Sequence, residues 1–217
     1  MGGRGASSNA TNYTRRQTGG IGGTSKPIDV SKIKDKSLQG VENRIRKLQH
    51  EEAFIFDKDD NLIAGVAGGS TSVGIPSDWD KIDGATVTHG HPTGQYGFGG
   101  TLSTADAVYM ANTNWSEMRA AAHGKGEYNY IMRRTSKANN QGLRDQIAKD
   151  EDTLKKRIGN TYQRAFDAAV KSGKDSKKAS REAAQMAAGV MDRYWTKTLP
   201  KFGFEYITRK KVYEYGR

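Results

Sequence analysis

The spacing of apolar residues changes along this chain of 217 residues, and that change limits the folds open to it. Between residues 53 and 134, short apolar runs are separated by turn-forming residues, which is typical of β-strands. From about residue 139 to 198, apolar residues recur with the 3.6-residue period of amphipathic helices. Residues 204–208 alternate again like a strand. The sequence therefore predicts an α+β fold, with a long helical hairpin inserted before the last strand.

The individual elements are expected where these patterns begin and end. Residues 1–25, rich in Gly, Ser, Thr and Asn, are expected to be disordered. Residues 92–102 contain four glycines and predict a mobile loop. The predicted elements are a helix over 37–50, a hairpin over 53–67, a strand ending at 89–91, a helix over 103–112, a hairpin over 116–134, and two helices divided at 172–176.

Two pairs of polar residues carry the strongest chemical signal. His89 and His91 are spaced i, i+2 at the end of an apolar stretch, so they project to one face of a strand. Ser103 and Asp106 are spaced i, i+3 at the start of a helix, so they lie on one face of its first turn. Together these residues supply the inventory of an open zinc site, in which three protein ligands leave the fourth position for water.

The absence of cysteine narrows the chemistry further. Disulfides, thiolate zinc sites and cysteine nucleophiles are excluded, so a metal must be held by His, Asp or Glu. A zinc deaminase, which needs cysteine ligands, is disfavoured, whereas a metal nuclease with His and Asp ligands stays open. A zinc hydrolase also needs a general base and a donor to the oxyanion. Glu51 or Glu52, just before the first core strand, is the candidate base, and Ser103 is the candidate donor.

The order of residue types, a glutamate, then His-x-His-Pro, then Ser-x-x-Asp, resembles the signature of the JAMM (JAB1/MPN/Mov34) metalloprotease family, which includes RadC-like and prokaryotic JAB proteins. The resemblance covers residues 51–106 and implies a JAMM/cytidine-deaminase-like mixed sheet with flanking helices. It also implies a zinc-dependent peptidase or isopeptidase that hydrolyses an amide bond. It assigns zinc to His89, His91 and Asp106, the general base to Glu51, and support of the oxyanion to Ser103.

The stretch from Glu51 to Leu62 resembles phage and mobile-element members of the family, in which a glutamate comes six residues before the turn aspartate. That spacing favours Glu51 over Glu52. The chain departs from the family pattern in two places. Gly90 stands where Asn or Ser is commoner, and the loop before Ser103 is longer than usual. The resemblance implies a virion or host protein as substrate.

Composition, hydrophobic period and the resemblance together predict four parts. These are a disordered tail (1–25), a JAMM-like metal-binding core (26–136), a basic helical hairpin insertion (137–200) and a closing strand of the core (201–217). No apolar stretch approaches the roughly 18 residues of a membrane span, so no membrane partner is expected. The expected location is the cytoplasm of a bacterial host, with virion-associated or secreted effector roles open.

The formal net charge of +11 is unevenly distributed. Residues 26–136 carry 13 basic and 14 acidic side chains, whereas residues 137–217 carry 19 basic and 10 acidic ones. Contact with nucleic acid or an acidic partner through residues 137–211 therefore stays open, although the simplest interpretation of the basic helices is that their charges form solvated faces. The alternative function is a catalytically inactive JAMM-fold module that binds a partner protein or nucleic acid through these basic helices.

Each part of the motif also has a purely structural interpretation. His-x-His-Pro can be a strand end with exposed imidazoles, and Ser-x-x-Asp is an ordinary helix-capping box. His50 is interpreted as a helix-end histidine rather than an accessory ligand, and His123 as a solvated turn residue. The joint order of the motif is what favours a metal centre.

Overall fold

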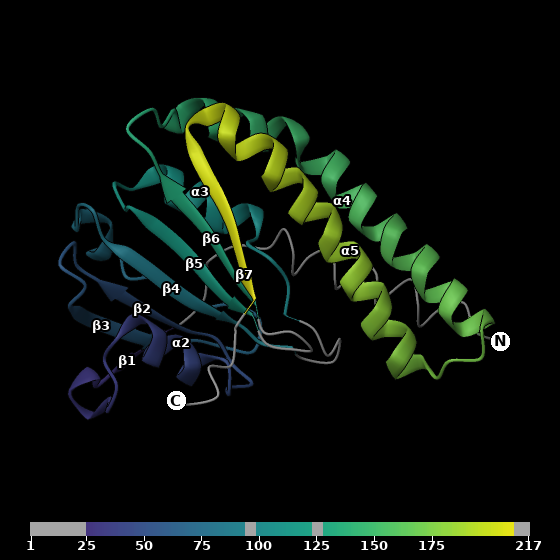
Figure 1. The fold of residues 1–217 in the computed structure, drawn as a ribbon, viewed down its shortest axis with the longest axis horizontal. Coiled ribbons are helices and arrows are strands. Elements are labelled where there is room, and N and C mark those ends of the chain that lie inside the picture. The colour runs from purple at the N-terminus through teal and green to yellow at the C-terminus, as the bar shows by residue number, and fades with distance from the viewer. Residues whose placement is uncertain (1–24, 94–98, 123–127, 211–217) are drawn as a thin grey trace, which may run out of the picture.

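The computed structural model describes residues 25–93, 99–122 and 128–210. In the described part of the chain, seven strands form one mixed sheet in the order β1-β3-β2-β4-β5-β6-β7 (Figure 1). The predicted α+β fold with a C-terminal helical hairpin is confirmed. The strands are β1 (Lys26–Ile28), β2 (Glu52–Phe56), β3 (Leu62–Ala67), β4 (Thr86–His91), β5 (Glu117–Ala122), β6 (Tyr128–Arg134) and β7 (Phe204–Lys210). The helices are α2 (Leu38–Ile45), α3 (Thr104–Asn112), α4 (Asn140–Lys171) and α5 (Ser176–Thr198), with short 3-10 turns η1 (Val30–Lys32), η2 (Trp79–Lys81) and η4 (Leu199–Phe202).

The pair β4–β5 is parallel, whereas the other neighbouring strands of the sheet are antiparallel. Parallel neighbours need a crossover connection, and α3 supplies it. The crossover returns the chain from the carboxyl end of β4 to the start of β5. It therefore places the N-terminus of α3 beside the last residues of β4, which is where a ligand site forms in α/β units.

The two faces of the sheet are covered by different helices, and strand β2 is buried on both. Ala53 and Ile55 belong to the larger apolar cluster, which includes residues of α3, α4 and α5. Phe54 and Phe56 belong to a smaller cluster with Val41 and Ile45 of α2. Because side chains alternate along a strand, odd-numbered residues of β2 face the hairpin side and even-numbered residues face α2.

The helical hairpin is longer than the sheet requires. Helix α4 has 32 residues, which corresponds to a length of about 48 Å. Figure 1 shows α4 and α5 extending side by side beyond the strands. The residues described contain no helix long and apolar enough to cross a membrane.

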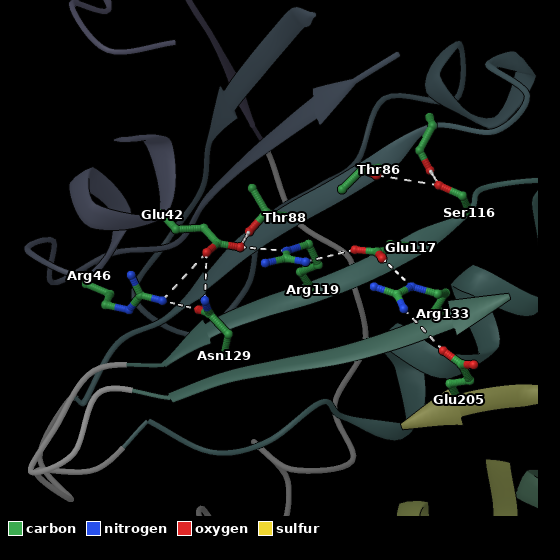
Figure 2. Close-up of polar contacts among 11 residues, drawn as sticks. Glu42, Arg46, Thr86, Thr88, Ser116, Glu117, Arg119, Asn129, Arg133 and Glu205 are labelled. Carbon is green, nitrogen blue, oxygen red and sulfur yellow. Dashed lines mark hydrogen bonds and ion pairs between the residues drawn. The ribbon is translucent and has the colours of Figure 1, made fainter. Parts of the chain in front are cut away.

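A network of charged side chains lies between α2 and the sheet (Figure 2). Glu42 accepts hydrogen bonds from Nε of Arg119 and Nδ2 of Asn129, each over 2.7 Å. Thr88 donates to the same carboxylate at 3.4 Å, and Arg46 lies 3.7 Å from it and also donates to Asn129. Glu42, Arg46 and Arg119 are at most 8% exposed. The network thus joins buried charges of the α2 region and β5 to neutral polar groups of β4 and β6.

The network continues along β5 and β6 toward solvent (Figure 2). Glu117 accepts from Nη1 of Arg119 at 2.8 Å and from Nε of Arg133 at 2.6 Å. Burial raises the pKa of the Glu117 carboxyl. Its hydrogen bonds and charge pairing with Arg119 and Arg133 lower the pKa by more, so the pKa lies below its usual value. Arg133 also pairs with the half-exposed Glu205 at 3.3 Å.

Most predicted elements are present, and three expectations need correction. The helix expected over 37–50 ends at Ile45, because the chain must turn before β2 begins. Strand β1 was not expected, since three residues are too few for a periodic pattern. Residues 99–102, expected in a mobile loop, are buried. The expectations for residues 1–24, 94–98, 123–127 and 211–217 lie outside the described residues.

Candidate metal centre

His89, His91 and Asp106 come together at the end of β4, as their spacing predicts. Nε2 of His89 lies 3.0 Å from Nε2 of His91 and 3.3 Å from Oδ1 of Asp106. Nε2 of His91 lies 3.6 Å from Oδ2 of Asp106. One ligand atom from each of the three residues falls within 4.8 Å of the others, so this group can hold a metal ion.

The separations within this cluster fit a small tetrahedral cation. Two ligand atoms, each about 2.0–2.1 Å from such an ion, lie about 3.3–3.4 Å apart. The three separations in the cluster, 3.0, 3.3 and 3.6 Å, fall on both sides of that value. The donor set of two imidazole nitrogens and one carboxylate suits a divalent transition metal.

Burying the Asp106 carboxylate costs free energy unless a positive charge lies beside it. The side chains of His89 and Asp106 are 3% and 4% exposed, and that of His91 is 12% exposed. Burial raises the pKa of the Asp106 carboxyl, but the charges and hydrogen bonds of both histidines outweigh it, so its pKa is lowered. The carboxylate also lies in the first turn of α3, where the helix dipole favours negative charge. The environment of Asp106 therefore favours its carboxylate form, which is the form that binds a metal cation.

Ser103 caps helix α3 and helps to orient Asp106. Oγ of Ser103 accepts from the backbone N–H of Asp106 at 3.1 Å, and Oδ2 of Asp106 accepts from the backbone N–H of Ser103 at 2.7 Å. This is the capping box anticipated as a structural interpretation of the pair. The two interpretations are compatible, because the capping hydroxyl uses only an acceptor position. Its O–H remains a donor for a group in the site.

The backbone carbonyl of Gly100 sets the tautomer of His91. Nδ1 of His91 lies 3.0 Å from this oxygen. A carbonyl can only accept, so Nδ1 carries the hydrogen and Nε2 of a neutral ring presents its lone pair to the cluster. Sequence reasoning missed Gly100, because a backbone acceptor leaves no signal in the residue type.

The strand register distinguishes Glu51 from Glu52. Ala53 of β2 lies opposite His89 of β4, so Glu51, two residues earlier, continues the face that carries the histidines. The backbone of Glu51 is bonded to residues 68 and 69, which extends the pairing of β2 with β3. Glu52 lies on the other face, where Arg44 donates two hydrogen bonds to it at 2.9 and 2.8 Å. Glu51 is 7% exposed.

Gly90, between the two histidines, faces helix α2. A Cβ at this position would lie 2.4 Å from Cγ2 of Ile45, a contact that real side chains do not make. The glycine therefore allows α2 to pack directly behind the two ligands. This close approach is a structural reason for a glycine at position 90.

The remaining histidines are not part of the described cluster. His50 lies five residues beyond the end of α2, and its Nε2 is 3.4 Å from Oε1 of Glu52. The expectation that it interacts with the end of that helix is wrong, because the helix stops early. His123 lies outside the described residues.

The chain was compared with known proteins in three ways. It matches no protein-family model, no curated protein and no solved structure.

Proposed function

We propose that this chain is a zinc-dependent, JAMM-like peptidase or isopeptidase. The observation that carries the proposal is the convergence of His89, His91 and Asp106 in one buried cluster on the face that Glu51 shares. Their order along the chain and their spacing resemble the family signature, and the ligand separations suit zinc. The resemblance to phage and mobile-element members favours a virion or host protein as the substrate.

Each residue of the site has a distinct chemical task under this proposal. Zinc, when held by the two histidines and Asp106, supplies Lewis acidity that polarises the scissile carbonyl and acidifies water. Glu51 takes a proton from the attacking water and delivers it to the leaving amine as the carbon–nitrogen bond breaks. Ser103 donates its O–H to the oxygen that becomes negative when the carbonyl carbon turns tetrahedral.

The first test is the metal content of the purified full chain, measured by plasma mass spectrometry. We expect about one zinc per chain, and its loss in Asp106→Asn, which keeps an oxygen able to cap α3. A chain that holds no zinc even after dialysis against zinc would overturn the proposal.

The second test separates catalysis from metal binding. Glu51→Gln should retain zinc but lose hydrolysis of a quenched peptide library and of a matching library of lysine ε-amides. Glu52→Gln is the matched control, because Glu52 lies on the opposite face and pairs with Arg44. Equal loss of hydrolysis in both variants would contradict the assignment of the base.

The surface of α4 supports a second candidate function, the binding of a nucleic acid. Arg157, Arg164 and Lys171 are exposed and recur every seven residues, which places them about 10 Å apart along one stripe. Duplex DNA binding through this stripe should weaken with salt, with a log–log slope near −0.9 for each phosphate neutralised. Replacing the three basic residues of the stripe by alanine should reduce that slope. Replacing three exposed lysines outside the helical hairpin (Lys32, Lys58 and Lys81) should not.

A further inference from the structure

The segment Gly99–Leu102 connects the candidate metal centre to the C-terminal part of the chain. Its four residues are buried, and Gly100 supplies the carbonyl that holds Nδ1 of His91 at 3.0 Å. The segment ends directly before Ser103, the cap of α3. Any group that fixes this segment therefore acts on two functional positions at once.

Helix α5 holds one end of the segment. Nε1 of Trp195 donates to the carbonyl of Leu102 at 2.8 Å, and Trp195 is 0% exposed while Leu102 is 1% exposed. A buried indole N–H needs a partner, so this bond fixes both the ring and the backbone that receives it. The bond spans 93 positions in the sequence.

Tyr206 of β7 holds the middle of the segment. Its hydroxyl donates to Oδ1 of Asp192 on α5 at 2.9 Å and lies 2.5 Å from Oγ1 of Thr101. Because Tyr206 has one proton and the carboxylate can only accept, Thr101 must donate to the tyrosine oxygen. Burial raises the pKa of Tyr206, and the charge of Asp192 raises it too, so the phenol keeps its proton.

We propose that Trp195, Tyr206 and Asp192 are positioning residues of the metal centre. They lie outside the motif, and they act through Gly99–Leu102 on the tautomer of His91 and on the start of α3. The proposal rests on the proposed function only in assuming a metal at the cluster. The partner that orients a ligating imidazole contributes to metal affinity, and its loss typically weakens binding 10–100-fold. The C-terminal end of α5 thus helps to position the metal ligands. Metal binding should in turn stabilise the packing of α5, because coupling between two equilibria is reciprocal.

Zinc affinity measured by competition with a chromophoric chelator tests this proposal. Tyr206→Phe removes the hydroxyl that joins Asp192 to Thr101, and Trp195→Phe removes the indole donor while keeping an aromatic ring. Both variants should bind zinc more weakly than the parent chain, by up to the roughly 10–100-fold that loss of a direct imidazole partner costs. Tyr194→Phe is the matched control. Tyr194 lies on α5 beside Trp195, but its hydroxyl faces Asp150 and not the segment Gly99–Leu102. The proposal fails if Tyr206→Phe binds zinc as tightly as the parent, or if the control weakens binding equally.

A second readout needs no metal and therefore separates this proposal from the proposed function. Nitrogen-15 chemical shifts of the His91 ring in the metal-free chain report which nitrogen carries the hydrogen. The parent should hold neutral His91 in the Nδ1–H form, and Tyr206→Phe should show a mixture of the two tautomers. An unchanged tautomer in Tyr206→Phe would overturn the positioning role, whether or not the parent chain binds zinc.

Discussion

Glu42 of helix α2 accepts a hydrogen bond from Nε of Arg119 of strand β5 over 2.7 Å, with both side chains nearly inaccessible to solvent. The bond joins a helix to a strand 77 positions away in the sequence. Removing one member of a buried ion pair leaves the other charge buried without compensation. Glu42→Ala should therefore lower the free energy of unfolding by about 3–5 kcal/mol, as measured by urea denaturation.

A surface ion pair provides the control for that measurement. Glu151 lies 2.9 Å from Lys155 on α4, but both side chains are about two-fifths exposed. Glu151→Ala should change the free energy of unfolding by only about 0.5 kcal/mol, since solvent screens exposed pairs. A similar cost in the two variants would show that the Glu42 network does not depend on burial.

Gly90→Ala should destabilise the fold, because its methyl group would lie 2.4 Å from Cγ2 of Ile45. Overpacking of this kind costs about 1–3 kcal/mol. In a double-mutant cycle with Ile45→Ala, which removes the obstructing methyl group, the two changes should cost less together than their sum. Additive costs would mean that the contact with α2 does not explain the glycine.

The lowered pKa of Glu117 predicts how stability depends on pH. A carboxyl whose pKa is lower in the folded chain than in the unfolded chain stabilises the fold above the unfolded pKa, about 4.3 for Glu. That contribution is lost as the pH falls through the folded pKa. Glu117→Gln should therefore lose less stability than the parent between about pH 6 and pH 3, in urea titrations across this range.

Glu205→Gln is the comparison for the pH experiment, because Glu205 is the half-exposed end of the same network. Since solvent screens exposed pairs, removing the Glu205 charge should cost at most about 1 kcal/mol of stability at neutral pH. If Glu117→Gln follows the parent between about pH 6 and pH 3, the pairing of Glu117 with Arg119 and Arg133 does not contribute to the acid sensitivity.

Ser103→Ala should have two separable effects. Loss of the helix cap should cost about 1 kcal/mol of stability, as should Ser37→Ala, because Ser37 caps α2 through the N–H of Gly40 at 3.0 Å. Only Ser103→Ala should also reduce the proposed hydrolysis, by on the order of 10²-fold, through loss of a donor to the oxyanion. Stability is read from urea denaturation and hydrolysis from the peptide library. Equal activity of the two variants would leave Ser103 with a capping role alone.

The sequence was sufficient to predict most element types, because hydrophobic period is a local property of the chain. The turn residues 57–61 separate β2 from β3, and Ser103 begins α3, as expected. The pairing of His89 with His91, and of Ser103 with Asp106, followed from local spacing, whereas the crossover through α3 brings the two pairs together. Helix α2 was predicted too long, since the turn that ends it is required by the position of β2.

Tertiary structure decided what local spacing leaves open. Hydrophobic spacing does not distinguish Glu51 from Glu52, and in the sequence only the resemblance to phage and mobile-element members favoured Glu51. The pairing of Ala53 with His89 puts Glu51, and not Glu52, on the histidine face. The contacts of Trp195 and Tyr206 with residues 99–102 depend on chain segments about 100 positions apart. Such contacts form because distant apolar surfaces are buried together, and a backbone carbonyl such as that of Gly100 acquires its role only from that packing.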